Sequence, residues 1–393
     1  MLSHGERMEA KMRDKIFLAS PHMSDGGYEQ AFIKEAFDTN WIAPLGKNVN
    51  EFEKEMAQKL GTKEAVALSA GTAAIHLALK SVGVKQDDIV LCQSLTFSAS
   101  ANPVTYEKAI PVFIDSEEDT WNMSPTALKN AIETYISKNK KPKAVIIVHL
   151  YGIAAKIKEI RAICDEFEIA LIEDAAESLG TKVDDRYTGT FGDYGIISFN
   201  GNKIITTSGG GMLLCNTEDS KERAAKARFW ATQSRENERH YEHKEIGYNY
   251  RMSNVVAGIG RGQLKVLDQR IEKKRDIYNR YRNAFKDIDD IVMMPFDKDN
   301  TYQNCWLTTI QIKEKSKVTP LDIMVALEKE NIESRPVWKP MHLQPVFKDC
   351  DYFDNGGVAE KLFKNGVCLP SDTKMTINQQ IDVIITIIKG LWK

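Results

Sequence analysis

The stretch SFNGNKIITTSGGGM, residues 198–212, places a single lysine between a short apolar segment and a run of hydroxyl and glycine residues. Lys203 is either a solvated surface charge or a reactive amine. A sheltered lysine amine can attack a carbonyl carbon and hold a carbonyl cofactor covalently as a Schiff base. The second interpretation requires partner groups elsewhere in the chain.

A candidate phosphate site lies in SAGTAAIHLAL, residues 69–79. An apolar strand pattern ends in Ser-Ala-Gly-Thr, and a helical pattern follows at once. The free backbone N–H groups near Gly71 and the Thr72 hydroxyl would then converge, which suits a phosphate. Taken alone, the segment also fits an ordinary helix N-cap.

A candidate carboxylate lies in LIEDAAESLG, residues 171–180, where Asp174 stands at the end of an apolar run. A strand-end aspartate is often a solvated loop residue. The case for Asp174 as a site residue is stronger because the next apolar run brings Ser198 and Lys203 to the same edge of a parallel sheet. An anion site, a carboxylate and a lysine together match pyridoxal 5′-phosphate, which needs a phosphate cradle, a partner for its ring nitrogen and an amine for attachment.

The elements that would position these groups alternate between strands and helices. Helical patterns, such as residues 124–139 and 154–168, separate short apolar runs that are typical of buried strands, and this alternation predicts a mainly parallel α/β sheet. The seven predicted strands are residues 65–68, 89–92, 111–114, 144–149, 169–173, 195–199 and 211–214.

The last third of the chain has a different pattern. A long helical pattern begins at Ser253, and a strand at residues 306–312 and helices at 320–331 and 377–393 follow it. These features predict a smaller α+β unit. We therefore divide the chain into an N-terminal arm (1–14), a large domain (15–265) and a small C-terminal domain (266–393).

The composition excludes some function classes. The 393 residues include 53 Lys or Arg and 55 Asp or Glu, so the formal net charge is −2 and gives no global basic field for nucleic acid or membranes. The first residues are charged, and the longest apolar stretch is too short to span a bilayer, so we expect a cytoplasmic protein. The six widely spaced cysteines lack the spacing of metal ligands, and we expect no metal.

An ordered series of motifs resembles the DegT/StrS-type sugar aminotransferases, a fold-type I family that depends on pyridoxal phosphate. The resemblance runs from about Ile16 to near the C-terminus. It rests on NWIAPLG at Asn40, SAGTAAIHLAL, QSLTFSASANPV at Gln93, PVFID at Pro111, HLYG at His149, IEDAAESLG, FGDYGIISFNGNKIITTSGGGM, GYNYRMSN at Gly247 and RPVWKPMH at Arg335. It implies a mainly parallel seven-stranded sheet in the large domain.

The resemblance also implies roles for single residues. Lys203 would hold the cofactor and later move a proton between cofactor and substrate carbons. Asp174 would face the ring nitrogen, Phe97 would stack on the ring, and Glu177 would lie near the cofactor hydroxyl or the sugar. Gly71, Thr72 and Ser198 would hold the phosphate, together with Asn249 of the other subunit in an obligate homodimer. One departure is Ser208 with its three glycines, where relatives often carry glutamate, so we assign that loop no catalytic role.

In detail the sequence is most similar to bacterial enzymes that aminate the C4 keto group of UDP-2-acetamido-4-keto-6-deoxyhexoses for bacillosamine-type glycans. This resemblance implies L-glutamate as amino donor and a cofactor that cycles through pyridoxamine 5′-phosphate. Candidate substrate contacts combine cations with aromatic rings, a mixture that suits a nucleotide diphosphate, although each residue also fits a solvated loop. They are Arg228, Arg235, His240, His243, Arg335, Trp338 and His342.

Other functions stay open at this stage. GIGRG at Gly258 is the only glycine-rich candidate for a dinucleotide-binding dehydrogenase, but it lies within a helical pattern instead of following a strand. Amination at C3, another fold-type I reaction and a non-catalytic cofactor-binding paralogue are further alternatives. Related dehydratases replace the lysine with histidine, so Lys203 favours transamination.

Overall fold

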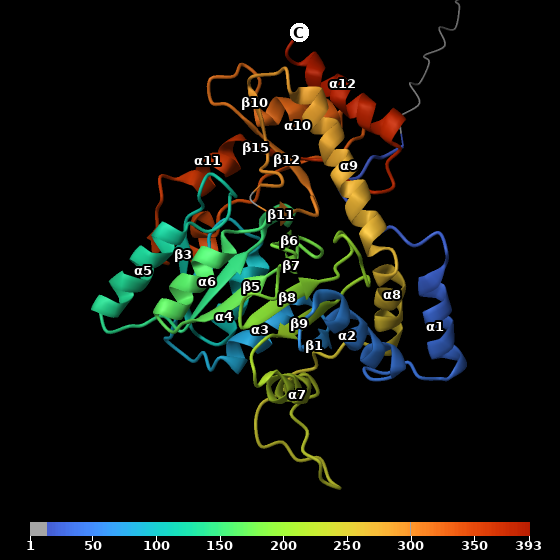
Figure 1. The fold of residues 1–393 in the computed structure, drawn as a ribbon, viewed down its shortest axis with the longest axis vertical. Helices are drawn as coiled ribbons and strands as arrows, with labels where there is room; N and C mark the ends of the chain where they lie inside the picture. The colour runs from blue at the N-terminus through green and yellow to red at the C-terminus, as the bar shows by residue number, and fades with distance from the viewer. Residues whose placement is uncertain (1–13, 299) are drawn as a thin grey trace, which may run out of the picture.

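The computed structural model describes residues 14–298 and 300–393, and its centre is a twisted sheet of eight strands (Figure 1). The predicted N-terminal arm lies outside the described residues except for Asp14. The strands of the sheet are β1 (Glu64–Leu68), β2 (Ile89–Gln93), β3 (Ile110–Ile114), β4 (Ala144–Val148), β5 (Ala170–Asp174), β8 (Tyr194–Ser198), β9 (Gly211–Cys215) and β14 (Tyr352–Phe353).

The strand order is β1-β9-β8-β5-β4-β2-β3-β14. Strand β9 pairs antiparallel with β1 and with β8, and the other pairs are parallel, so the mainly parallel α/β class predicted from the sequence is confirmed. All seven predicted strands form. The eighth strand, β14, comes from the segment assigned to the small domain and pairs with β3. Two residues are too short for any periodicity to reveal a strand.

Helices cover both faces of the sheet because its strands are apolar on both sides. One face packs against α3 (Gly71–Ser81), α4 (Asn102–Tyr106) and α7 (Ser220–Ala231). The other face packs against α5 (Pro125–Ser137) and α6 (Ile157–Glu166). Helix α5 begins where the sequence signals predict, since the Ser124 hydroxyl accepts a hydrogen bond from the Ala127 N–H and Pro125 occupies the first turn.

The glycine-rich GIGRG segment is helical, as predicted, and lies in α8 (Asn254–Leu264). Helix α8 packs against α1 (Tyr28–Asp38) and α2 (Lys47–Leu60). A methyl group on Gly260 would lie 2.6 Å from the Phe52 ring, and one on Gly262 would lie 2.5 Å from the Glu29 nitrogen. These glycines therefore serve close helix packing, and the dehydrogenase alternative loses its only motif.

A second sheet of four strands forms in the last third of the chain, shown in orange and red in Figure 1. Its order is β10 (Ile291–Met293), β12 (Thr308–Ile312), β15 (Gly366–Leu369) and β13 (Arg335–Pro336), with antiparallel pairing throughout. The helices of this region are α9 (Leu267–Phe285), α10 (Pro320–Glu328), α11 (Val358–Asn365) and α12 (Asp382–Gly390), which follows a π-helical turn, Ile377–Ile381. The domain division at residue 265 stays a prediction.

A third, small sheet joins β6 (Lys182–Val183), β7 (Arg186–Tyr187) and β11 (Thr301–Tyr302). It pairs a segment from the first half of the chain with a loop that precedes β12. Among the described residues, no helix has the length and apolar character that crossing a membrane requires.

Helix α9 carries a buried cation to the junction between the two large sheets. The Lys274 side chain is 4% exposed, and its Nζ donates hydrogen bonds to the Trp306 carbonyl at 2.8 Å and to the Ser371 carbonyl at 2.6 Å. Burial lowers the pKa of Lys274 from 10.5 to about 8, although the nearby Asp372 carboxylate acts in the opposite direction. The ammonium thus ties three separate chain segments together at an electrostatic cost.

This cost predicts a specific pH dependence of stability. Between pH 8 and 10.5 the unfolded chain still binds the Lys274 proton while the folded chain has released it. The Lys274 contribution to the free energy of unfolding therefore rises with pH in this window. We expect the free energy of unfolding of the wild type, relative to that of Lys274→Met, to increase by roughly 2–3 kcal/mol between these two pH values. Chemical denaturation measures this difference. A difference that stays flat with pH would contradict the buried, depressed lysine.

Candidate active site

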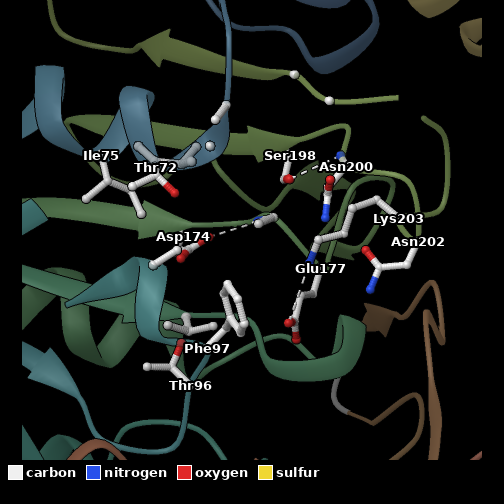
Figure 2. A pocket seen from close by; sticks show the side chains of 18 of the residues that line it. Thr72, Ile75, Thr96, Phe97, Asp174, Glu177, Ser198, Asn200, Asn202 and Lys203 are labelled. Atoms are coloured by element: carbon white, nitrogen blue, oxygen red, sulfur yellow. Dashed lines mark hydrogen bonds and ion pairs between the residues drawn. The ribbon is translucent and has the colours of Figure 1, made fainter. Parts of the chain in front are cut away.

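A cavity of about 380 Å³ opens at the carboxyl ends of β4, β5 and β8, where the start of α3 meets the sheet (Figure 2). The parallel topology brings these strand ends to one edge. The cavity gathers most of the residues predicted to bind the cofactor. Its walls include Gly71, Thr72, Phe97, Asp174, Glu177, Ser198, Lys203 and Trp338.

The start of α3 forms one end of the cavity. Among the residues that the structure describes, no side chain caps this helix, so backbone N–H groups of its first turn lack a capping oxygen. A methyl group on Gly71 would lie 3.4 Å from the Ser198 Cβ, so the end of β8 stands directly beside the helix start. Unpaired N–H groups, the helix dipole and two hydroxyls, from Thr72 and Ser198, suit a phosphate group.

Asp174 ends β5 and lies between the start of α3 and Phe97 (Figure 2). Its side chain is almost fully buried, and its two oxygens accept hydrogen bonds from the Ser100 hydroxyl at 2.7 Å and the Ala176 N–H at 3.1 Å. Burial raises the pKa of Asp174, and these hydrogen bonds together with the Lys203 charge oppose the rise. Its direct hydrogen-bond partners are neutral, so the carboxylate favours a cation in the cavity.

Lys203 and Glu177 point toward each other across the cavity (Figure 2). The Lys203 Nζ lies 3.6 Å from one Glu177 oxygen, while the other oxygen accepts a hydrogen bond from the Tyr151 N–H at 2.7 Å. Burial raises the pKa of Glu177, and the Lys203 charge is the largest effect against it. Tyr151 reaches this position through a left-handed backbone, with φ of 55°, a conformation that non-glycine residues adopt at a cost.

Aromatic rings form the remaining wall. The Lys203 Nζ lies 4.1 Å from the centre of the Trp306 ring, and Phe97 contacts Trp338 with ring centres 5.4 Å apart. Tyr151 stacks between the two tryptophans, at 6.4 Å from Trp306 and 6.1 Å from Trp338. The cavity therefore combines buried carboxylates, one amine and flat apolar faces, which suits a charged aromatic cofactor.

Comparison with known proteins decides the family. The profile of the DegT/DnrJ/EryC1/StrS aminotransferase family matches residues 24–388. The chain belongs to this family. Family membership confirms the aminotransferase class and pyridoxal phosphate as the cofactor, both of which the sequence predicted.

Curated relatives extend over most of the chain. EpsN from Bacillus subtilis (strain 168), provisionally named a pyridoxal phosphate-dependent aminotransferase, is 54% identical over 95% of both chains. The GDP-perosamine synthase of Vibrio cholerae is 35% identical over 88% of this chain and 91% of its own. The UDP-4-amino-4,6-dideoxy-N-acetyl-beta-L-altrosamine transaminase of Campylobacter jejuni is 32% identical over 69% of this chain and 66% of its own.

Solved structures confirm the fold. The crystal structure of a DegT DnrJ EryC1 StrS aminotransferase from Brucella abortus superposes with a TM-score of 0.85. It is 29% identical and covers 93% of this chain and 95% of its own.

Pyridoxal phosphate fits the residues of this DegT-family cavity. The hydrogen bonds that the described residues donate to the buried Asp174 carboxylate come from neutral groups, so its negative charge can pair with a protonated ring nitrogen. The uncapped start of α3 offers N–H groups to a phosphate, and the Lys203 amine lies within the same cavity.

Two predicted substrate residues lie near the cavity without lining it. Arg335 pairs with Glu333 at 2.7 Å and borders a neighbouring hollow that shares Asn202 and Trp338 with the cavity. The His342 ring is held by Ser94 at 2.6 Å and Glu360 at 3.1 Å and stacks on Tyr352 with ring centres 3.7 Å apart. These contacts favour a structural role for His342.

Five other predicted residues do not line the cavity of their own chain. Arg228 donates hydrogen bonds to the buried Glu53 carboxylate and to the Ala65 carbonyl, contacts that occupy its guanidinium. The loop between α7 and α8, which projects below α7 in Figure 1, carries the rest. These exposed residues are Arg235, His240, His243 and Asn249.

The sequence did not reveal Trp306, Tyr151 or Asn202 as site residues. Asn202 lies one residue before the predicted lysine, so its position was the available signal. Trp306 lies 103 residues after Lys203, in a segment predicted to be a strand of the small unit. Only the packing of that segment against the large sheet brings its indole to the amine, and no local pattern encodes such packing.

The start of α3 lies in close backbone contact with β9, which gives a test with a matched control. A methyl group on Gly211 would lie 2.3 Å from the Ala70 carbon and the Gly71 nitrogen, whereas one on Gly209 would meet nothing within 4 Å. We expect Gly211→Ala to lower the free energy of unfolding by about 3 kcal/mol or more, because backbone atoms must move. Gly209→Ala should leave it unchanged or slightly higher. Thermal and chemical denaturation measure both variants, and an equal loss of stability in Gly211→Ala and Gly209→Ala would refute this close contact.

Proposed function

We propose that this protein transfers the amino group of L-glutamate to the C4 keto group of a UDP-linked 4-keto-6-deoxy-N-acetylhexose. The product would be a UDP-4-amino-4,6-dideoxy-N-acetyl sugar. The observation that carries the proposal is the Lys203 amine, 3.6 Å from the Glu177 carboxylate, in a cavity of a DegT-family aminotransferase. An amine in this position can serve both as attachment point and as proton carrier.

We assign the cofactor contacts residue by residue. Lys203 holds the cofactor covalently, Asp174 faces its ring nitrogen, and Phe97 covers its ring. Gly71, Thr72 and Ser198 bind its phosphate. Bound pyridoxal phosphate supplies an electron sink that stabilises negative charge at the substrate carbon. The burial of Asp174 and the uncapped start of α3 support these assignments.

Lys203 also acts on the substrate. Its amine lies between the Glu177 carboxylate and the Trp306 ring. In this position the amine would carry a proton between the substrate carbon and the cofactor carbon, which is the general acid–base step that amino transfer requires. Glu177 accepts a hydrogen bond from the Tyr151 backbone and so keeps its free oxygen toward the amine or toward a sugar hydroxyl.

The choice of sugar rests on the sequence resemblance and on the names of relatives. The Campylobacter jejuni relative is named for a UDP-linked 4-amino-4,6-dideoxy-N-acetyl sugar, and UDP is also what the motif resemblance implies. The Vibrio cholerae relative favours a second candidate, because its name specifies a GDP-linked sugar. Amination at C3 is the third alternative. The cytoplasmic location stays a prediction from the sequence.

We further propose a homodimer in which each subunit completes the other's site. Asn249 is exposed and does not line the cavity of its own chain. The loop that carries Arg235, His240 and His243 also extends from the body beside α7 (Figure 1). In a shared site, Asn249 binds the partner's cofactor phosphate and the cations of the loop face the nucleotide.

The substrate proposal predicts the outcome of a two-step reaction on purified protein loaded with cofactor. L-Glutamate should bleach the visible absorbance of the cofactor, and a UDP-linked 4-keto-6-deoxy-N-acetylhexose should restore it within one turnover. A GDP-linked 4-keto-6-deoxyhexose should restore it at least tenfold more slowly. Restoration by the GDP sugar alone would replace the UDP assignment, and no response to either sugar after bleaching by glutamate would overturn the proposed sugar substrate.

The shared-site proposal predicts complementation between two impaired variants. Lys203→Ala removes the amine, and Asn249→Asp places a negative charge toward the partner's phosphate. Mixed dimers contain one intact site, so activity should return when the two variants are unfolded and refolded together. Asn130→Asp, a change at an exposed residue of α5, is the matched control and should retain full activity by itself. A verified mixed dimer without recovered activity would exclude the shared site.

A further inference from the structure

Trp306 is held by three hydrogen bonds, two from its backbone and one from its indole, although nothing in the sequence marked the residue as functional. Its backbone N–H donates to the Asn304 side-chain oxygen at 2.9 Å, and its carbonyl accepts from the buried Lys274 ammonium at 2.8 Å. Its indole N–H donates to the Asn202 carbonyl at 2.8 Å. The two backbone contacts fix the position of the residue, and the contact of the indole N–H favours one rotamer of its side chain.

The segment that carries Trp306 is also tied to the turn that carries Glu177. The Asn304 amide nitrogen donates to the Glu177 carbonyl and to the Leu179 carbonyl, both at 3.0 Å. Between Asn304 and Trp306, Cys305 adopts a left-handed backbone with φ of 51°. Non-glycine residues keep such a conformation only where their surroundings enforce it. The hydrogen bonds and the strained backbone thus set Trp306 relative to Glu177.

This fixed indole faces the reactive amine. The Lys203 Nζ lies 4.1 Å from the centre of the Trp306 ring and 3.6 Å from the Glu177 carboxylate. The electron-rich face of an indole attracts an ammonium group. The Asn202 carbonyl that holds the ring lies one residue before Lys203, so the ring and the lysine backbone keep a constant relation.

The buried ammonium of Lys274 is unusual in its partners. Within residues 14–298 and 300–393, its hydrogen-bond partners are two backbone carbonyls, and the Asp372 carboxylate that acts on its charge lies beyond ion-pair distance. A buried lysine without a direct ion pair is expensive, whereas an apolar residue would fill the same core at less cost. One of the two carbonyls belongs to Trp306, so the lysine orients the residue that faces Lys203.

We propose that Trp306 is a positioning residue that holds the free amine of Lys203 in its reactive place, and that Lys274 acts through it by anchoring the Trp306 carbonyl. This inference rests on the proposed role of Lys203. When the amine is not attached to the cofactor, the indole and the Glu177 carboxylate keep it beside the reacting carbon. The remaining possibility is that Trp306 only fills the core, since the residue is 1% exposed.

The first test compares two replacements of Trp306. Phenylalanine keeps an aromatic face, and leucine keeps only bulk. We expect Trp306→Leu to lower kcat of the complete transamination at least tenfold, with KM for glutamate within twofold of wild type. Trp306→Phe should recover kcat to within about threefold of wild type. Equal kcat values for the two folded variants would show that Trp306 only fills space.

The second test needs no activity. Reductive methylation of cofactor-free protein with 13C-formaldehyde places labelled methyl groups on Lys203, whose resonance is identified by its loss in Lys203→Arg. Because the nitrogen lies over the indole, the signal should be shifted upfield in wild type and should move to the position of solvated lysines in Trp306→Leu. An unshifted wild-type signal would overturn the proposal.

A separate pair of variants tests the role of Lys274. Lys274→Met removes the donor to the Trp306 carbonyl, and Lys273→Met, the adjacent position on α9, is the matched control. We expect Lys274→Met to lower kcat about threefold to tenfold and to reduce the upfield shift, with Lys273→Met unchanged in both. A folded Lys274→Met protein with the wild-type shift and kcat would exclude the anchoring role. The resonance test uses no sugar substrate. A failure of the proposed sugar assignment can therefore be distinguished from a failure of the positioning role of Trp306.

Discussion

The burial of two carboxylates around a single amine is the constraint on which this structure depends. Asp174 is 5% exposed and Glu177 is 4% exposed, and burial raises the pKa of both groups. Lys203 is the cation at ion-pair distance from Glu177, while Asp174 relies on neutral donors. An uncompensated buried charge is costly, so the cavity favours a ligand that brings its own positive charge beside Asp174. This preference links the electrostatics of the fold to its chemistry.

The topology supplies the groups that this constraint requires. Strands β5 and β8 are parallel neighbours, so Asp174 and Ser198 reach the same edge of the sheet. The start of α3 adds N–H groups at that edge, and the reversed direction of β9 brings Gly211 against the helix start. A side chain at Gly211 would occupy the space of that backbone. The position of the α3 start thus depends on a glycine in a strand as much as on the residues that line the cavity.

Much of this arrangement is predictable from the sequence, because apolar runs and cofactor motifs are local signals. The apolar runs predict the seven long strands of the main sheet, and the strand-end positions of Asp174 and Ser198 predict that they converge. The wall formed by Trp306 is not predictable, because it arises when a distant segment packs against the sheet. The same limit explains Arg228 and His342, whose partners Glu53 and Ser94 lie 175 and 248 residues away. Asn249 is a different case, because the role that the sequence resemblance implies for it lies in the site of a second subunit.

The most direct test of this account is to locate the cofactor by mass. Protein loaded with pyridoxal phosphate would be reduced with borohydride, digested and analysed for the lysine that carries the added group. If Lys203 is the attachment point, the modification lies on Lys203 alone and disappears in Lys203→Arg. Modification of another lysine, such as the buried Lys274, or unchanged labelling in Lys203→Arg, would contradict the assignment on which the proposed chemistry depends.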